Sequence, residues 1–265
     1  MDRNHRIFLC AAFSPGLEVT SYIVARFPGT LVGAATCDRD DSPFEARIAE
    51  CLAGGGVEVV RRMDLNSAGF RSHLVPLAVD IVLMAWIPTI IKGQQLAAAR
   101  VGWVNMHPSL LPWGRGKHAY YWTCVEGTPF GATLHFIDEK IDAGRILWQK
   151  VLDVTPSDTG ESLYHRSVQA TVQLLRDNYG RLLRGEYAAW SPSEHGSFHS
   201  GRELDAHSQI DLERTYRGAE LLDILRGRSF ANGASAFFIK NGRKYYVRVR
   251  IDPADEGHRE VPENA

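Results

Sequence analysis

Three kinds of side-chain group between residues 105 and 144 could act together on one carbonyl carbon. Asn105 and His107 stand two residues apart at the end of an apolar run, and the later segment of residues 138–144 adds a carboxylate. An amide N–H can stabilise the negative charge that develops on a carbonyl oxygen, and an imidazole can carry protons. A carboxylate can orient the imidazole. This set of groups suits the transfer of an activated one-carbon acyl group to an amine.

The spacing of the first two residues indicates how they would be placed. In extended backbone the side chains at i and i+2 project from one face of a strand, so Asn105 and His107 would line the same pocket. An isolated Asn-x-His is a weak signal, because a histidine before Pro108 often only closes a turn. His135 lies in another apolar run, where we expect a supporting or packing role. Ser109 lacks the flanking pattern of a nucleophilic serine.

The first half of the chain alternates strand-like and helical patterns that would position these residues. Strands are predicted over residues 6–12, 31–36, 57–60, 80–86 and 102–105, and helices over 17–27, 43–52, 67–77 and 90–99. Several of the strands are apolar on both faces, which is typical of a parallel sheet covered by helices on both sides. Ligands of such sheets bind beyond the carboxyl ends of the strands, where residues 86–88 and 105–107 both fall.

The second half shows a different order of elements. Strands are predicted over residues 132–137 and 145–151, and helices over 161–183 and 216–225. Asp158 and Glu161 have capping-box spacing at the start of the first of these helices. A hairpin is predicted with arms 236–240 and 244–251 and a turn at Asn241-Gly242. We therefore predict an α/β fold with a Rossmann-like, mostly parallel sheet and helices on both faces over residues 1–185. Residues 186–201 would be a connector, and residues 202–265 a small C-terminal α+β subdomain that contains the hairpin.

Composition and charge narrow the class of protein. The 265 residues are 45% hydrophobic and 23% charged, which is ordinary for a globular protein, and the net charge of -1 argues against nucleic-acid binding. The apolar runs are too short to cross a membrane, and the N-terminus lacks a signal-peptide pattern. The four cysteines have no CxxC spacing, so neither a disulfide framework nor a metal site is expected. No GxGxxG follows the first strand, which disfavours nicotinamide binding. We expect a cytoplasmic protein without a metal or a membrane partner.

Several motifs at fixed spacing resemble the formyltransferases that use N10-formyltetrahydrofolate. This family includes glycinamide ribonucleotide transformylase, methionyl-tRNA formyltransferase and the nucleotide-sugar N-formyltransferases. The resemblance rests on residues 105–112 (NMHPSLLP), Arg115-Gly116, residues 131–139 (GATLHFIDE), Asp142-x-Gly144 and Gln149. It implies that Asn105 holds the formyl oxygen, that His107 carries a proton, and that Asp142 is the partner carboxylate of His107.

The same resemblance implies where the folate co-substrate would bind. The family provides main-chain contacts to the pterin at the end of the fourth predicted strand, and an acidic loop borders the pterin from the other side. These regions correspond here to Trp86, Ile87, Pro88 and Ile90, and to Asp138 and Glu139. An apolar strand end suits a flat heterocycle. An ordinary core position is the alternative for Trp86.

The C-terminal pattern resembles the nucleotide-sugar members of the family. It comprises residues 197–199, 210–212, 225–230, 236–238 and 242–247. The resemblance implies an acceptor amine on a 3- or 4-amino-deoxysugar linked to dTDP or GDP, and a role in lipopolysaccharide O-antigen synthesis. The predicted hairpin could cover the core or pair across a two-fold axis, and because symmetric dimers are the commonest oligomers we expect a homodimer. The residues expected to contact the acceptor, which alternatively form a solvated loop, are Ser109, Arg115, Gly116, Lys117 and Tyr120.

The chain departs from the sugar members in two places. Many of them read Pro-Asn where this chain has Ala119-Tyr120, and His-Ile-Ser where it has His107-Pro108-Ser109. Formylation of hydroxyornithine or glycinamide ribonucleotide is therefore the main alternative. Methionyl-tRNA is disfavoured, because a tRNA-binding member would need a basic C-terminal domain. A folate or nucleotide-sugar sensor without catalytic activity is the alternative from another class.

Overall fold

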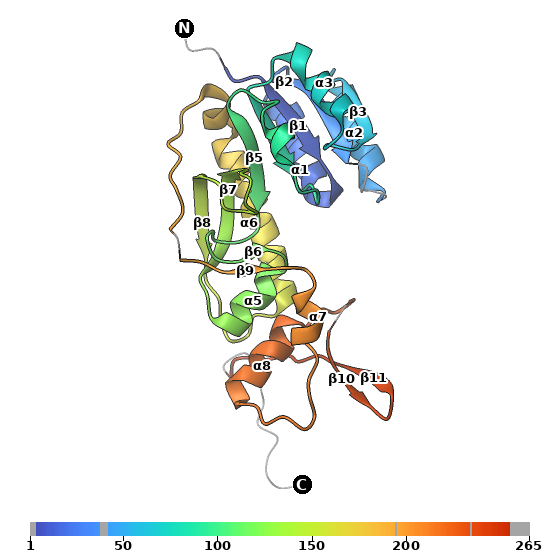
Figure 1. Cartoon of the computed structure of the whole chain (residues 1–265), viewed down its shortest axis with the longest axis vertical. Coiled ribbons are helices and arrows are strands. Elements are labelled where there is room, and N and C mark those ends of the chain that lie inside the picture. The colour runs from blue at the N-terminus through green and yellow to red at the C-terminus, as the bar shows by residue number, and fades with distance from the viewer. Residues whose placement is uncertain (1–3, 38–41, 194, 234, 255–265) are drawn as a thin grey trace.

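A seven-stranded sheet forms the centre of the molecule in the computed structural model, which describes residues 4–37, 42–193, 195–233 and 235–254 (Figure 1). The strand order is β3-β2-β1-β4-β5-β7-β8. The strands are β1 (Ile7–Ala11), β2 (Leu31–Cys37), β3 (Val59–Met63), β4 (Ile81–Ala85), β5 (Gly102–His107), β7 (Phe130–Phe136) and β8 (Ile146–Leu152). The first five pair in parallel, whereas β7 and β8 join as antiparallel strands. The predicted mostly parallel sheet is confirmed.

Helices cover both faces of this sheet because the central strands are apolar on both faces. In β1, Ile7 and Leu9 pack with α1 (Phe13–Arg26), α2 (Phe44–Gly54) and α6 (Gly160–Arg184), whereas Phe8 packs on the opposite face with α3 (Ala68–Leu77). Successive strand residues point to opposite faces, so one strand contributes to two cores. All five residues of β1 are fully buried. These two cores hold the carboxyl ends of β4 and β5 in place.

The structure differs from the predicted elements at two helices. The helix predicted over residues 90–99 is reduced to α4 (Gly93–Leu96), because Asn66 hydrogen-bonds the backbone of Ile90 and Lys92 and holds the segment before α4 in an irregular path. The helix predicted over 161–183 is present as α6. Its capping box is formed by Thr159 and Ser162 rather than by Asp158 and Glu161.

The carboxylate of Asp158 has a different role from the predicted cap. It accepts hydrogen bonds from the Ser162 hydroxyl at 2.8 Å and from the Arg166 guanidinium at 2.9 Å. Helix α5 (Ala119–Glu126), which the local pattern did not predict, packs against α8 (Gly218–Gly227). The contacts of Asp158 lie within the first turns of α6, whereas the packing of α5 joins segments that are distant in the sequence.

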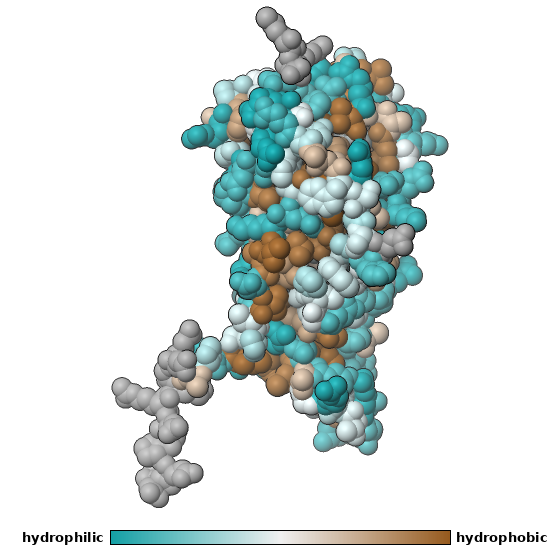
Figure 2. Space-filling model, turned by 90° about the vertical axis from the view of Figure 1, so that its left-hand side faces the viewer, coloured by the Kyte–Doolittle hydropathy of each residue, from teal (hydrophilic) through white to brown (hydrophobic). Residues whose placement is uncertain are grey.

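The C-terminal part contains α7 (Glu203–His207), α8 (Gly218–Gly227) and an antiparallel hairpin of β10 (Ala236–Lys240) and β11 (Arg243–Val247). The hairpin confirms the predicted turn, since Asn241 and Gly242 have φ values of 51° and 72°. Among the described residues, no helix is long and apolar enough to cross a membrane. Figure 2 shows one face of the molecule, which is largely hydrophilic with an apolar area near its middle.

The predicted connector is hydrogen-bonded to the sheet domain. Trp190 forms a bridge with Ile146 of β8, and β9 (Phe198–His199) pairs in parallel with β6 (Arg115–Gly116). In Figure 1 this segment runs along the outside of β8 before it reaches α7. The domain boundaries at residues 185 and 201 stay a prediction.

Candidate active site

The register of two neighbouring strands gathers the first side chains of the site. Asn105 and His107 lie on one face of β5, and the antiparallel register sets His135 of β7 directly opposite Asn105. The Asn105 Nδ2 and His135 Nε2 atoms are 3.3 Å apart. The rings of His107 and His135 lie edge to face, with centroids 6.0 Å apart. The predicted strand end therefore presents an amide and two imidazoles together.

The loop between β7 and β8 brings Asp142 to the same place. Asp142 has a φ of 50°, a conformation that non-glycine residues seldom adopt outside functional or tightly held turns. Its Oδ2 lies 3.7 Å from His107 Nδ1, and its Oδ1 lies 3.7 Å from His135 Nε2. A Cβ atom at Gly144 would collide with the carbonyl oxygen of Phe136, so only glycine fits there. This close approach explains the Asp-x-Gly spacing.

The hydrogen bonds of His107 determine which of its nitrogens is available. Nε2 donates to the carbonyl oxygen of Gly114 at 3.0 Å, so Nδ1 carries the lone pair and faces Asp142. The His107 side chain is 9% exposed. Nδ1 is thus a proton acceptor in a largely buried site, and the Asp142 carboxylate would stabilise the imidazolium that forms.

The ionisation states of Asp142 and His135 depend on their burial and on the groups around them. Burial opposes ionisation of Asp142, but His107, His135 and the Gly116 N–H outweigh it and hold the pKa of the carboxyl below its usual range. The Gly116 N–H donates to Asp142 Oδ2 at 2.9 Å. Burial, together with His107, lowers the pKa of His135 despite the opposing charge of Asp142. At neutral pH the cluster therefore combines an ionised carboxylate with a neutral His135.

His135 has a more specific place than the packing role we expected. Its Nδ1–H donates to the carbonyl oxygen of Phe136 at 2.8 Å, which leaves Nε2 to accept from the Asn105 amide. An amide NH2 group has two donors. One N–H of Asn105 is therefore oriented by His135, and the other remains for a substrate oxygen. The signal for this contact is strand register, which the sequence pattern alone does not reveal.

The residues predicted to contact the folate lie on two adjoining segments. Trp86 directly follows β4 with a φ of 65° and is half-buried, and Ile87 packs against the core that also includes Ile137. Pro88 is half-buried and Ile90 is 66% exposed. Asp138 and Glu139 are exposed on the opposite loop, and the Glu139 carboxylate lies beside Gly93. Ile87 and Ile137 thus tie the two segments to one core, and the contacts of both segments to folate stay predictions.

The predicted acceptor residues fall into two groups. The Ser109 hydroxyl is buried and donates to the Trp113 carbonyl at 2.8 Å, and the Gly116 N–H is bound to Asp142, so these groups are engaged internally. Arg115 differs, because its buried Nε has no hydrogen-bond partner among the described residues and its guanidinium lies 6.0 Å from the Phe198 ring centroid.

Lys117 and Tyr120 continue this segment toward α5. Lys117 is exposed, and no ion pair of its side chain occurs within the described parts of the chain. The Tyr120 hydroxyl lies 2.9 Å from His118 Nδ1, and its ring contacts Tyr164 and Phe230. This segment thus presents cations and an aromatic ring next to the catalytic residues.

The same cluster has the ligand types of a metal site. One nitrogen each of His107 and His135 and an oxygen of Asp142 lie within 4.8 Å of one another. A cation held there would occupy His135 Nε2, the atom to which Asn105 donates. The expectation that the protein works without a metal stays a prediction.

Comparison with known proteins is consistent with this geometry. Residues 11–178 match the Formyl transferase family, and residues 203–253 match the N-formyltransferase dimerization C-terminal domain. A dTDP-4-amino-4,6-dideoxyglucose formyltransferase of Mycobacterium tuberculosis is 28% identical over 226 residues, which cover 85% of this chain and 83% of that protein.

Solved structures share the fold. A sugar N-formyltransferase from Shewanella sp. superposes with a TM-score of 0.80 at 21% identity, over 94% of this chain and 98% of that one. An N-formyltransferase from Helicobacter canadensis, in complex with folinic acid and dTDP-3-aminofucose, superposes with a TM-score of 0.70 at 18% identity. The match covers 90% of this chain and 85% of that one. The family match spans more than half of the sequence and includes Asn105, His107, His135 and Asp142. The chain belongs to the formyl transferase family.

Proposed function

We propose that this protein transfers the formyl group of N10-formyltetrahydrofolate to the amine of a nucleotide-linked 3- or 4-amino-deoxysugar. The observation that carries the proposal is the cluster of Asn105, His107 and Asp142 on a chain that belongs to the formyl transferase family. The Mycobacterium tuberculosis relative is named for a dTDP-4-aminosugar, and the Helicobacter canadensis structure holds a dTDP-3-aminosugar. Both support a dTDP-linked acceptor.

Each member of the cluster has a distinct part in the transfer. When the acceptor amine bonds to the formyl carbon, the formyl oxygen gains negative charge, and Asn105 donates its second N–H to it. His107 Nδ1 takes the proton that the new C–N bond makes acidic. Asp142 stabilises the resulting imidazolium, which then gives the proton to the folate nitrogen as the old C–N bond breaks. The products are the formamide and tetrahydrofolate, and His107 is restored.

The segments on either side of the cluster would hold the two substrates. Trp86, Ile87, Pro88 and Ile90 would border the pterin on one side, and Asp138 and Glu139 on the other. The acceptor would enter past Arg115, Lys117 and Tyr120, whose charges and ring suit a diphosphate and a base. The internally bound Ser109 and Gly116 would shape this entrance.

The C-terminal part favours a sugar acceptor over the other small amines. Residues 203–253 match a domain described for N-formyltransferases, and the aminosugar relative aligns with 85% of this chain. Glycinamide ribonucleotide and hydroxyornithine remain the alternatives to test. A tRNA acceptor is disfavoured by the net charge of -1.

The C-terminal hairpin supports a homodimer. A two-stranded hairpin is marginal in isolation, and this one exposes Ile239, Tyr245 and Tyr246 by 49%, 41% and 58%. The match of this region to a dimerization domain suggests that the exposed side chains pack across a two-fold axis. Use of the product in O-antigen, and location in the cytoplasm, stay predictions.

Mass spectrometry of the reaction tests the proposal. Purified protein is incubated with N10-formyltetrahydrofolate and with dTDP- and GDP-linked 3- and 4-aminosugars, glycinamide ribonucleotide or hydroxyornithine. We expect a formyl mass gain on one dTDP-linked aminosugar, and none with His107→Ala. Formylation of glycinamide ribonucleotide or hydroxyornithine instead would refute the acceptor and leave the chemistry intact. Folate binding without any transfer would favour a sensor.

A further inference from the structure

Arg228, directly after α8, is a buried cation whose hydrogen-bonding capacity is only partly used. The residue is 8% exposed, and its Nε has no partner among the residues that the structure describes. Within the described parts of the chain, its one ion pair is a 2.8 Å contact from Nη2 to Asp205, whose side chain is 81% exposed. A solvated carboxylate offsets little of the free-energy cost of burying a guanidinium. Arg228 therefore has both the charge and the donors for a further acceptor.

The surroundings of Arg228 are those of an anion site. It lies close enough to His118, Tyr120 and Tyr121 for its charge to affect the pKa of all three. Helix α5 begins at Ala119, and the side chain of its N-cap residue His118 does not cap it. The N-terminus of a helix favours anions. Burial, and the charges of Arg228 and Lys117, lower the pKa of His118 and keep it neutral, so that it can bind an anion only as a hydrogen-bond donor.

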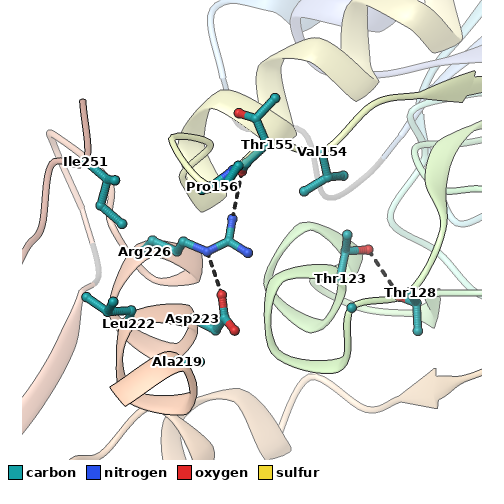
Figure 3. Close-up of a pocket in the computed structure, with 11 residues that line it drawn as sticks. Thr123, Thr128, Val154, Thr155, Pro156, Ala219, Leu222, Asp223, Arg226 and Ile251 are labelled. Atoms are coloured by element: carbon teal, nitrogen blue, oxygen red, sulfur yellow. Dashed lines mark hydrogen bonds and ion pairs between the residues drawn. The ribbon is translucent and has the colours of Figure 1, made fainter. Parts of the chain in front are cut away.

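The neighbouring Arg226, in the last turn of α8, is an arginine whose Nε and Nη1 both have hydrogen-bond partners. Its Nη1 lies 3.0 Å from the Asp158 carbonyl. Arg226 also donates from Nε to Asp223 at 2.7 Å, and its Nη1 lies 3.2 Å from the Thr155 carbonyl (Figure 3). It lines a cavity of about 440 Å³ that includes none of the catalytic residues. Arg226 thus joins α8 to the sheet domain, whereas Arg228 contacts Asp205 through Nη2 and leaves its Nε without a partner among the described residues.

The backbone before Arg228 is packed against α5, the helix that follows the segment bound to Asp142. A Cβ atom at Gly227 would come within 3.1 Å of Tyr121 and of Cys124, so the backbone before Arg228 packs tightly on α5. Gly116 binds Asp142, and His118 follows two residues later, within about 7 Å of backbone. Lys117, between them, is near enough to both Asp142 and His118 to affect their pKa. Lys117 and the neutral His118 therefore connect Gly116, the partner of the Asp142 carboxylate, to the surroundings of Arg228.

From this arrangement we infer that Arg228 binds the diphosphate of the acceptor, so that the C-terminal part contributes to the acceptor site besides any role in dimerization. The inference rests on the proposed function, which supplies a nucleoside diphosphate with its sugar at the catalytic cluster. Arg115, with its own unpartnered Nε, and Lys117 would approach the same phosphates. A guanidinium binds phosphate through two parallel N–H donors, which Nε and one Nη provide.

Binding of dTDP and thymidine by titration calorimetry tests the inference, because the two ligands differ only in the phosphates. We expect wild-type protein to prefer dTDP, and Arg228→Gln to weaken dTDP at least about tenfold while changing thymidine less than about twofold. In the transfer assay the KM for the nucleotide sugar should rise and that for N10-formyltetrahydrofolate should stay the same. Arg226→Gln is the matched control, expected to lower the melting temperature and to preserve the preference for dTDP.

Two results would overturn the inference. One is an unchanged dTDP affinity in Arg228→Gln, and the other is equal weakening of dTDP and thymidine, which would indicate a structural role. If Arg228→Gln does not fold, Arg228→Lys takes its place. We then expect a severalfold loss of affinity for dTDP with little change for thymidine, and an unchanged dTDP affinity would overturn the inference. Absence of transfer to any nucleotide sugar by wild-type protein would refute the proposed function separately. Even then, the dTDP measurement still decides the role of Arg228.

Discussion

Two regions of this protein pair a histidine with carboxylates, and they do so in opposite ways. At the catalytic cluster, His107 lies 3.7 Å from Asp142, beyond hydrogen-bond distance. Between the connector and the C-terminal part, His199 has both ring nitrogens in tight contacts, at 2.7 Å from Glu126 and 3.0 Å from Glu203. The His199 ring also stacks on Trp122, with centroids 3.6 Å apart. Every polar atom of this second histidine is used.

The difference between the two histidines separates a side chain that holds segments together from one that keeps a nitrogen available for a substrate. His199 links β9, α5 and α7, and through β9 it secures β6, whose Gly116 N–H holds Asp142. A histidine bound at both nitrogens has no lone pair left for a substrate. His107 keeps Nδ1 open beside a carboxylate, an arrangement that stabilises a proton when one arrives. Variants of the two histidines should therefore fail in different assays.

The largest expected effect is the loss of turnover in His107→Ala. Removing the proton carrier should lower kcat about 100- to 10,000-fold, while the melting temperature stays within a few degrees of the wild type. Stopped-time formyl-transfer assays and thermal melting measure both quantities on the same preparation. A kcat within tenfold of the wild type would show that His107 does not carry the proton.

The next effect concerns the amide that His135 orients. Asn105→Ala should lower kcat on the order of 100- to 1000-fold, because one preorganised donor to the developing oxyanion is lost. His135→Gln should have a smaller effect in the same direction, since Asn105 keeps its donors but loses the contact that aligns them. Comparable losses in the two variants would mean that His135 itself takes part in the chemistry.

Local sequence patterns predict that Asn105 and His107 lie together, and they predict much less about the surroundings of these residues. A spacing of two residues at a strand end is enough to put Asn105 and His107 on one face. The Asp142-x-Gly144 spacing reflects the close approach of Gly144 to the carbonyl oxygen of Phe136, at the start of the same loop. His135 was harder to place, because its position opposite Asn105 depends on strand register. Register arises from pairing between distant segments, which composition and periodicity do not specify.

Elements held by long-range contacts could not be predicted from local patterns. Helix α5 has aromatic residues on several sides and begins after His118 in the left-handed conformation, with a φ of 62°. The β6–β9 pair joins two-residue segments that are more than eighty positions apart. The unused Nε of Arg228 is visible only once α5 and α7 are packed around it. In each case tertiary contacts outweigh local propensity.

The comparison predicts a different failure for His199. His199→Ala should lower the free energy of unfolding by about 1 to 3 kcal/mol, because two charge-assisted hydrogen bonds and the stacking on Trp122 are lost. The kcat at saturating substrate should fall far less than in His107→Ala. Urea unfolding and formyl-transfer assays measure the two effects. A kcat as low as that of His107→Ala, with unchanged stability, would contradict a structural role.

The smallest expected effect is the contribution of Glu203 to the pH dependence of the free energy of unfolding. Hydrogen bonds from Ser200 and His199 lower the pKa of Glu203 to about 2, from an ordinary value near 4.5. A carboxyl with a depressed pKa stabilises the fold above its unfolded pKa, and this contribution is lost as the pH falls through the folded one. Glu203→Gln should therefore be less stable than the wild type at pH 7, and the gap should narrow between pH 4.5 and 2. Urea unfolding of both proteins across this range measures the gap, and a gap that stays constant down to pH 2 would show that Glu203 is not ionised in its contact with His199.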